Sequence, residues 1–304
     1  MALDPGDRPR PARWTVSGEQ ILVGYDGSPD AARALDWALD EAGRSGRPVR
    51  VAYVFEWLTV AGWIGPGVAP GVWPDEEARR QVEELVSRAA RDAGTTHPEL
   101  TVTGEVLDGP PALVLQEASV DAGLLVLGTR GHGGFGELLA GSTAVTVAAH
   151  AHCPVVVVRD GTSERWTGPV AVGVDGSECS LLALGFAYEQ AAARRVPLRV
   201  VRAWQLPAGR WAPPDFDPDA AVAEARTEVE EALTRWRGAF PNVEVTVDVA
   251  GGSASSLLVE ASRGAGLVVV GTRGRGGLRG MLLGSVSQQL LHHAHCPVAV
   301  VRER

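Results

Sequence analysis

Short apolar runs alternate along this chain with amphipathic segments of helical period. Most of the apolar runs lack the polar–apolar alternation of a strand with one solvated face, which is typical of strands buried in a parallel sheet. In the first half, the pattern predicts strands at 20–25, 48–55, 100–107, 124–127 and 155–158, and helices at 30–43, 75–93, 110–120 and 142–150.

The second half repeats this order with the same landmarks. In each half, the first strand is followed by Asp-Gly-Ser, which ends at Ser28 or at Ser177. A later apolar run is followed by Gly-Thr-Arg-Gly, which ends at Gly131 or at Gly274. We therefore expect two tandem domains of one fold. The predicted divisions are a disordered tail at 1–17, a first domain at 18–159, a polar linker at 160–168 and a second domain at 169–304.

Alternating strands and helices predict the α/β class, with a five-stranded parallel sheet in each half and helices on both of its faces. In such a doubly wound sheet, ligands bind beyond the carboxyl ends of the strands, where the winding direction reverses. If the first and fourth strands of each half are neighbours there, Asp26 meets the loop that begins at Gly128. Asp175 then meets the loop that begins at Gly271.

Two glycine-rich stretches form these loops: GTRGHGGFGELLAGST at 128–143 and GTRGRGGLRGMLLGSV at 271–286. Glycine allows a backbone to come close to a ligand. The main-chain N–H groups of such a loop, with the amino end of the following helix, make a site that suits phosphate. Both stretches therefore indicate phosphate binding, although a tight strand-to-helix turn without a ligand is the simpler alternative.

Composition and charge narrow the function. The 304 residues carry a formal net charge of −9, which disfavours a long nucleic-acid footprint. All 28 basic residues are arginine, which excludes a P-loop lysine and a Schiff-base lysine. Three cysteines give no disulfide framework, and neither a membrane-spanning run nor a secretory signal is recognisable, so we expect a cytoplasmic protein.

The spacing Gly-x2-Gly-x9-Gly-Ser, which begins at Gly128 and at Gly271, resembles the nucleotide-binding signature of the ATP-binding universal stress proteins. Each half also has Asp-Gly-Ser after its first strand and His-x-His-Cys-Pro before its last strand, so the resemblance covers about residues 18–303. It implies two tandem Rossmann-like domains of the adenine nucleotide alpha hydrolase-like type, with strand order 3-2-1-4-5. It also implies ATP as the bound cofactor, with Mg²⁺ or Mn²⁺ only as counter-charge.

The same resemblance implies roles for single residues. Asp26 and Asp175 are expected to reach ribose hydroxyls, and Val54 and Ala203 to read the adenine edge through their backbones. The other implied contacts to adenosine and phosphates are Gly24, Gly128, Gly131, Gly141, Ser142 and Thr143 in the first half, and Gly173, Gly271, Gly274, Gly284, Ser285 and Val286 in the second. The Thr143 hydroxyl, which Val286 lacks, is expected to shift affinity between the two sites.

Several of these residues have alternative roles. Arg130 and Arg273, between the first two motif glycines, either clamp a terminal phosphate or face water. Asp26 and Asp175 are also suited to capping the first helix of each half.

The His-x-His-Cys clusters at 150–153 and 293–296 raise the possibility of zinc. Neither cluster has a Cys-x2-Cys partner, so packing is the favoured interpretation and no metal site is predicted.

We expect the nucleotide to regulate this protein rather than to react on it. The sequence has no repeated pair of nucleophile and base and no paired acids, so no catalytic residue is predicted. The predicted function is an ATP-binding regulatory module of the stress response, with two sites per chain and at most a weak ATPase activity. A slow ATPase or phosphotransferase, and a nucleotide-free scaffold or chaperone-like protein, remain alternatives.

The expected partners are an adenine nucleotide and a second copy of the chain, with neither nucleic acid nor membrane. Family members commonly pair through the last strand of the domain. The resemblance therefore implies an internal pseudo-dimer through the apolar runs 155–158 and 298–301, and a homodimer of chains.

Overall fold

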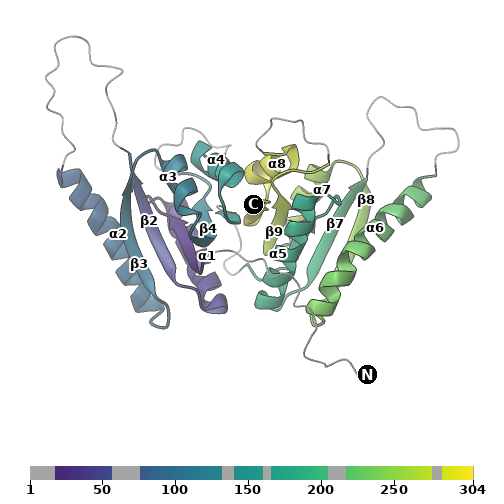
Figure 1. Ribbon diagram of the computed structural model, residues 1–304, viewed down its shortest axis with the longest axis horizontal. Helices are drawn as coiled ribbons and strands as arrows, with labels where there is room; N and C mark the ends of the chain where they lie inside the picture. Colours follow the sequence, from purple (N-terminus) through teal and green to yellow (C-terminus); the bar gives the residue numbers. More distant parts are fainter. Residues whose placement is uncertain are drawn as a thin grey trace, which may run out of the picture. The chain divides into compact units, whose positions relative to one another are not determined.

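The computed structural model describes residues 18–56, 76–131, 140–159, 166–204, 217–275 and 283–303. The predicted tail at 1–17 and residues 160–165 of the predicted linker lie outside these ranges. The chain divides into two compact units, the first built on residues 16–161 and the second on residues 162–303. Figure 1 shows a sheet flanked by helices in each unit.

The first unit is a doubly wound α/β domain. Its parallel strands have the spatial order β3-β2-β1-β4-β5. The chain adds strands outward from β1 to β3 and then crosses back to β4 on the other side of β1, so the winding direction of the sheet changes between β1 and β4. The elements are β1 (Gln20–Gly24), α1 (Pro29–Ser45), β2 (Val49–Phe55), α2 (Glu76–Thr96), β3 (Val102–Asp108), α3 (Pro111–Ala118), β4 (Ala122–Gly128), α4 (Ser142–His150) and β5 (Val155–Val158).

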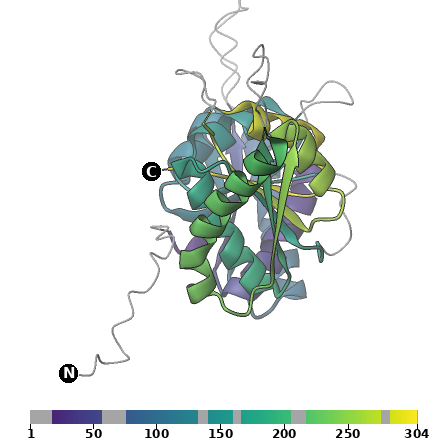
Figure 2. The same cartoon turned by 90° about the vertical axis from the view of Figure 1, so that its right-hand side faces the viewer.

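The second unit repeats this topology with the order β10-β9-β6-β7-β8, again all parallel. Figure 2 views this unit from the side of α6. The elements are β6 (Val170–Gly173), α5 (Glu178–Arg194), β7 (Leu198–Trp204), α6 (Pro218–Ala239), β8 (Val245–Gly251), α7 (Ala254–Ala261), β9 (Leu267–Gly271), α8 (Ser285–His293) and β10 (Val298–Val301). The predicted fold class and the order 3-2-1-4-5 are therefore confirmed in both halves.

Apolar strands and one apolar helix face make the core of the first unit. Ile21 and Leu22 of β1 are fully buried, and so are Trp37 and Ala38 of α1, which contacts β1 and β4. Burial on both sides of the strands explains why the apolar runs do not alternate. Among the described residues, no helix combines the length and the apolar character needed to cross a membrane.

Local signals set the ends of α1. The Ser28 hydroxyl accepts a hydrogen bond from the Ala31 amide at 3.2 Å, and Pro29 occupies the first helical position. The helix runs past the predicted end at residue 43 because the left-handed residue that stops it is Gly46, with φ of 70°.

An aromatic stack joins the two long helices of the second unit. Tyr188 of α5 lies 6.0 Å from Trp236 of α6 and 5.8 Å from Phe240, measured between ring centroids. Burial raises the pKa of the Tyr188 hydroxyl to about 12, since the apolar surroundings disfavour the phenolate.

Two leucines test the assignment of the core. Leu290 of α8 is fully buried, whereas Leu113 of α3 is 50% exposed. We expect Leu290→Ala to lower the free energy of unfolding by about 2–5 kcal/mol, because it removes buried methyl groups and leaves a cavity. Leu113→Ala is expected to change it by less than about 0.5 kcal/mol. Urea unfolding followed by circular dichroism measures both, and equal losses would contradict the packing described.

Candidate nucleotide-binding site

In each unit the turn after the first strand lies against the glycine loop after the fourth. Parallel pairing of Val23 with Val126, and of Val172 with Val269, brings the carboxyl ends of these strands to one edge of the sheet. The Ser28 hydroxyl then donates a hydrogen bond across this edge to the Arg130 carbonyl oxygen at 3.3 Å. The structure thus brings together the two segments that carry most of the predicted site residues.

The Asp175 carboxylate connects the turn and the glycine loop of the second unit. Its Oδ1 accepts hydrogen bonds from the amide and hydroxyl of Ser177, at 2.9 and 2.6 Å. Its Oδ2 accepts the Arg275 amide of the glycine loop at 2.7 Å. One carboxylate therefore fixes both its own turn and the loop across the edge of the sheet.

These hydrogen bonds control the charge of Asp175. Burial is the largest single influence and opposes ionisation. The hydrogen bonds from Ser177, the Arg275 amide and Ser180 together outweigh it and hold the pKa of Asp175 below its usual range. Asp175 is therefore an anion at neutral pH, able to accept further hydrogen bonds.

In the first unit, Asp26 accepts the Ser28 amide on Oδ1 at 2.9 Å. A methyl group built on Gly131 would lie 2.4 Å from Asp26 Oδ2, and one on Gly274 would lie 2.3 Å from Asp175 Oδ2. Any other residue at these positions would push the loop and the carboxylate apart. The second motif glycine is thus explained by contact with the aspartate in both units.

The helix caps decide between two roles of the aspartates. Ser28 caps α1, and Ser177 caps α5 by accepting the Ser180 amide at 3.3 Å. The aspartates instead form a side-chain turn with the amide of the capping serine. The capping role considered for Asp26 and Asp175 therefore belongs to the serines.

The ends of each glycine loop are joined to each other. The Gly141 amide donates to the Thr129 carbonyl oxygen at 2.7 Å, and the Gly284 amide donates to the Thr272 carbonyl oxygen at the same distance. The loops return through these contacts to the amino ends of α4 and α8, near the upper edge of each unit in Figure 1.

Within the described ranges, no side chain caps either of these two helices. Gly141 and Gly284 occupy the cap positions of α4 and α8, and no side chain accepts a hydrogen bond there. The predicted phosphate ligands Ser142 and Ser285 are exposed first residues of the helices, and Thr143 and Val286 follow half-buried. The amino ends of both helices therefore have main-chain N–H groups of the kind that bind anions at helix termini.

The remaining predicted glycines also contact the protein itself. A methyl group on Gly24 would lie 2.4 Å from a Leu127 side-chain carbon, and one on Gly173 would lie 2.7 Å from Leu258. Methyl groups on Gly128 and Gly271 would approach the backbones of Asp30 and Cys179 to 2.7 and 2.8 Å. These four glycines let the strand ends pack closely, whatever ligand they meet.

Val54 and Ala203 lie near the carboxyl ends of β2 and β7, where they pair with Leu107 and Ala250. Both are half-buried. They stand on the strand next to β1 or β6, at the edge of the sheet where the aspartates lie.

Sequence reasoning missed Asp30, a buried carboxylate in the first turn of α1. Its Oδ2 accepts the Thr129 hydroxyl at 2.8 Å and the Arg130 amide at 3.0 Å, and it lies 3.6 Å from Arg130 Nε. Its Oδ1 pairs with Arg33. The equivalent position of the second unit is Cys179, whose sulfur accepts only a long contact of 3.8 Å from the Thr272 hydroxyl.

A second difference between the units lies beside the turns. In the second unit, Glu228 of α6 pairs with Arg202 of β7 at 2.9 Å and with Arg275 of the glycine loop at 3.5 Å. In the first unit, Leu85 of α2 lies against Gly27. Aligning the two halves of the sequence would expose both differences, but not the contacts that they make.

The His-x-His-Cys clusters hold turns in place. The Ser119 hydroxyl accepts the His152 amide at 2.8 Å, and the Ser262 hydroxyl accepts the His295 amide at the same distance. Cys153 and Cys296 are buried, and the described residues contain no group of three metal-binding side chains.

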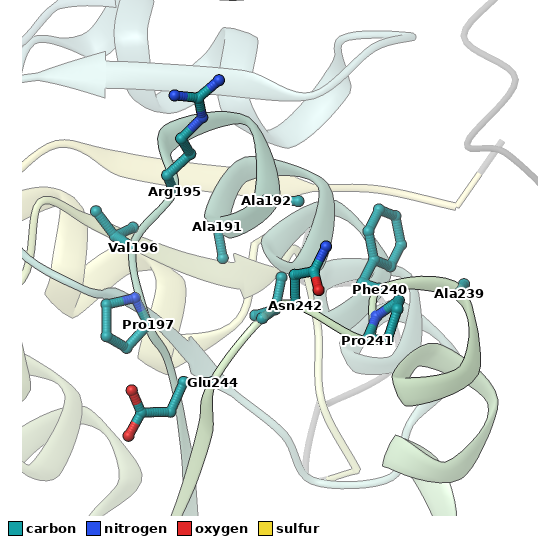
Figure 3. Close-up of a pocket in the computed structure, with 11 residues that line it drawn as sticks. Ala191, Ala192, Arg195, Val196, Pro197, Ala239, Phe240, Pro241, Asn242 and Glu244 are labelled. Atoms are coloured by element: carbon teal, nitrogen blue, oxygen red, sulfur yellow. The ribbon is translucent and has the colours of Figure 1, made fainter.

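A cavity of about 520 Å³ lies elsewhere in the second unit. Its walls are the residues that follow α5 and α6 and lead into β7 and β8, among them Arg195, Phe240 and Glu244 (Figure 3). These residues precede the strands, whereas the predicted nucleotide site lies beyond their carboxyl ends. The cavity is therefore separate from that site.

Comparison with known proteins identifies the family. Residues 19–159 and 167–302 each match the Universal stress protein family. The chain belongs to the universal stress protein family. A universal stress protein of Mycobacterium tuberculosis is 36% identical over 292 residues, which cover 93% of this chain and 96% of that protein. One of Mycolicibacterium smegmatis is 36% identical over 287 residues, with 93% and 97% covered.

The universal stress protein fold is also seen in a solved structure. The crystal structure of a universal stress protein from Archaeoglobus fulgidus superposes with a TM-score of 0.67 at 20% identity, covering 94% of this chain and 98% of that one. At this identity the likeness concerns the fold.

The pKa of Asp175 gives a test of the site's internal contacts. Because the folded pKa lies below the usual value of 3.8, ionised Asp175 contributes stability above that pH, which is lost as the pH falls through the folded pKa. We expect Asp175→Asn to lower the free energy of unfolding by about 1 kcal/mol at pH 7, after allowance for its partial exposure. The deficit should shrink below about pH 4.

Urea unfolding between pH 3 and pH 8 measures this deficit. Asp121→Asn, at an exposed position, is the matched control and should show no such deficit. A deficit for Asp175→Asn that is the same at every pH would contradict the role given to its charge.

Proposed function

We propose that this universal stress protein binds ATP at two sites per chain and acts as a nucleotide-dependent regulatory module of the stress response. The observation that carries the proposal is duplicated: in each unit an aspartate lies against a glycine loop whose ends are joined, beside a helix that no described side chain caps. Because both units build this arrangement from the same residue types, a role outside local folding is favoured.

The phosphate tail is assigned to the loop and the helix end. Free N–H groups at the amino ends of α4 and α8 and the positive end of each helix dipole attract anions. Gly128, Gly131, Gly141, Ser142 and Thr143 would provide these contacts in the first site. Gly271, Gly274, Gly284, Ser285 and Val286 would provide them in the second. Mg²⁺ or Mn²⁺ would accompany ATP as counter-charge on the phosphates.

The nucleoside is assigned to the adjoining strand ends. A carboxylate has lone pairs for several donors, so Asp26 and Asp175 can accept ribose hydroxyls in addition to the amides that they already bind. Val54 and Ala203, on the neighbouring strand, would meet the adenine through their backbones, with Gly24 and Gly173 beside the adenosine.

A nucleotide-free scaffold is the second candidate, and a specific observation favours it. The motif glycines at 24, 128, 131 and their counterparts at 173, 271 and 274 all have close neighbours within the protein. At 128 and 271 these neighbours are backbone atoms, which require glycine even without a ligand. We propose no catalytic residue and at most a weak ATPase activity. Pairing of the last strands, homodimer formation and a cytoplasmic location complete the proposal.

The ligand carried by the purified protein tests the main proposal. Heat denaturation should release ATP close to two equivalents per chain, identified by mass spectrometry. Release of no nucleotide, together with no ATP binding in calorimetry, would favour the scaffold. Continuous ADP formation by the wild type above that of the double variant Gly131→Ala/Gly274→Ala would favour the slow ATPase.

The motif glycines test where the nucleotide binds. We expect Gly131→Ala and Gly274→Ala each to remove one ATP site, because the added methyl group pushes the loop and the aspartate apart. The neighbouring atom belongs to a side-chain end, so the circular dichroism spectrum should stay unchanged. Gly94→Ala, within α2 and with no atom near the added methyl group, is the matched control. Loss of helix signal in the loop variants would instead assign these glycines to folding.

A further inference from the structure

The two proposed sites differ at one residue that lies beside the arginine of the glycine loop and decides whether this arginine has an acidic partner. Asp30 in the first unit and Cys179 in the second hold the same place relative to Asp26 and Asp175. Both are buried beside the threonine that opens the loop, but only Asp30 carries a charge.

Asp30 contacts both the backbone and the side chain of Arg130. The Arg130 amide donates to Asp30 Oδ2 at 3.0 Å, and the guanidinium Nε lies 3.6 Å from the same oxygen. The Arg130 side chain is 39% exposed and that of Asp30 only 9% exposed. A phosphate that takes Arg130 from Asp30 would leave a buried carboxylate with fewer partners, which is costly.

Arg273 is the counterpart of Arg130, and its situation is the opposite. It is exposed, and neither its amide nor its guanidinium has a hydrogen bond or ion pair to any residue that the structure describes. Cys179 supplies no charge to hold it. Its planar fork of donors is therefore available to a phosphate group, which suits bidentate contact.

From this contrast we infer that the two sites select different phosphate tails. The second site, with Arg273 uncommitted, prefers ATP strongly over AMP. The first site, with Arg130 held by Asp30, discriminates less between the two. The inference rests on the proposed function, since it assigns different nucleotide classes to the same two sites.

A reciprocal exchange tests the inference in the full-length chain. Asp30→Cys is made in the Gly274→Ala background, which leaves the first site, and Cys179→Asp in the Gly131→Ala background, which leaves the second. Calorimetry with ATP and with AMP gives the affinity ratio for each site. We expect Asp30→Cys to raise the ATP-to-AMP ratio about tenfold and Cys179→Asp to lower it by about the same factor, the order of one charge-assisted hydrogen bond.

Further variants separate this role from a structural one. Asp30→Asn keeps the side-chain shape and should also raise the ratio, which covers the case in which Asp30→Cys does not fold. Asp40→Asn removes one negative charge from the same helix at a residue paired with Arg44, and should leave the ratio unchanged. Arg130→Ala added to Asp30→Cys should cancel the gain.

The outcomes distinguish two failures. If the unaltered chain binds no adenine nucleotide, the proposed function fails and the inference fails with it. If the chain binds ATP but the exchange leaves both ratios unchanged, or the gain survives Arg130→Ala, only the inference is overturned.

Discussion

The parallel pairing of the first and fourth strands in each unit is the constraint on which the site depends. Parallel neighbours end at the same edge of a sheet, so the turn after β1 must meet the loop after β4, and likewise for β6 and β9. The aspartate carboxylate then holds these segments in place by accepting hydrogen bonds from amides of its own turn and, in the second unit, from an amide of the loop. Strand order therefore brings the segments of the candidate site together, and side-chain hydrogen bonds then fix their geometry.

The close approach of loop and aspartate packs the edge of the sheet at the place where the nucleotide is proposed to bind. Gly131 and Gly274 are glycines because an aspartate oxygen lies where a side chain would begin. Close packing and the proposed nucleotide binding therefore favour the same residue type at these positions.

The pattern of apolar runs predicted a parallel α/β sheet in each half, and the repeated motifs predicted the duplication. The strand order, which brings Asp26 and Asp175 to the glycine loops, was implied by the family resemblance. Neither the pattern nor the resemblance predicted Asp30 or the Arg202–Glu228–Arg275 cluster. Those contacts join residues from separate elements, and they depend on side-chain reach rather than on period. Asp30 is instead typical of a first helical turn, where an acidic residue needs no distant partner to be explained.

Gly185 and Trp236 show how far the duplicated halves have diverged. A methyl group on Gly185 would lie 2.6 Å from the Trp236 ring, so the indole occupies the space that a side chain at 185 would need. The corresponding residues of the first half are Asp36 and Ala93. In the second half, a larger residue at 185 alone would collide with the indole, and a smaller residue at 236 alone would leave a void. Replacing α5 or α6 alone by its counterpart from the first half would therefore disturb this packing.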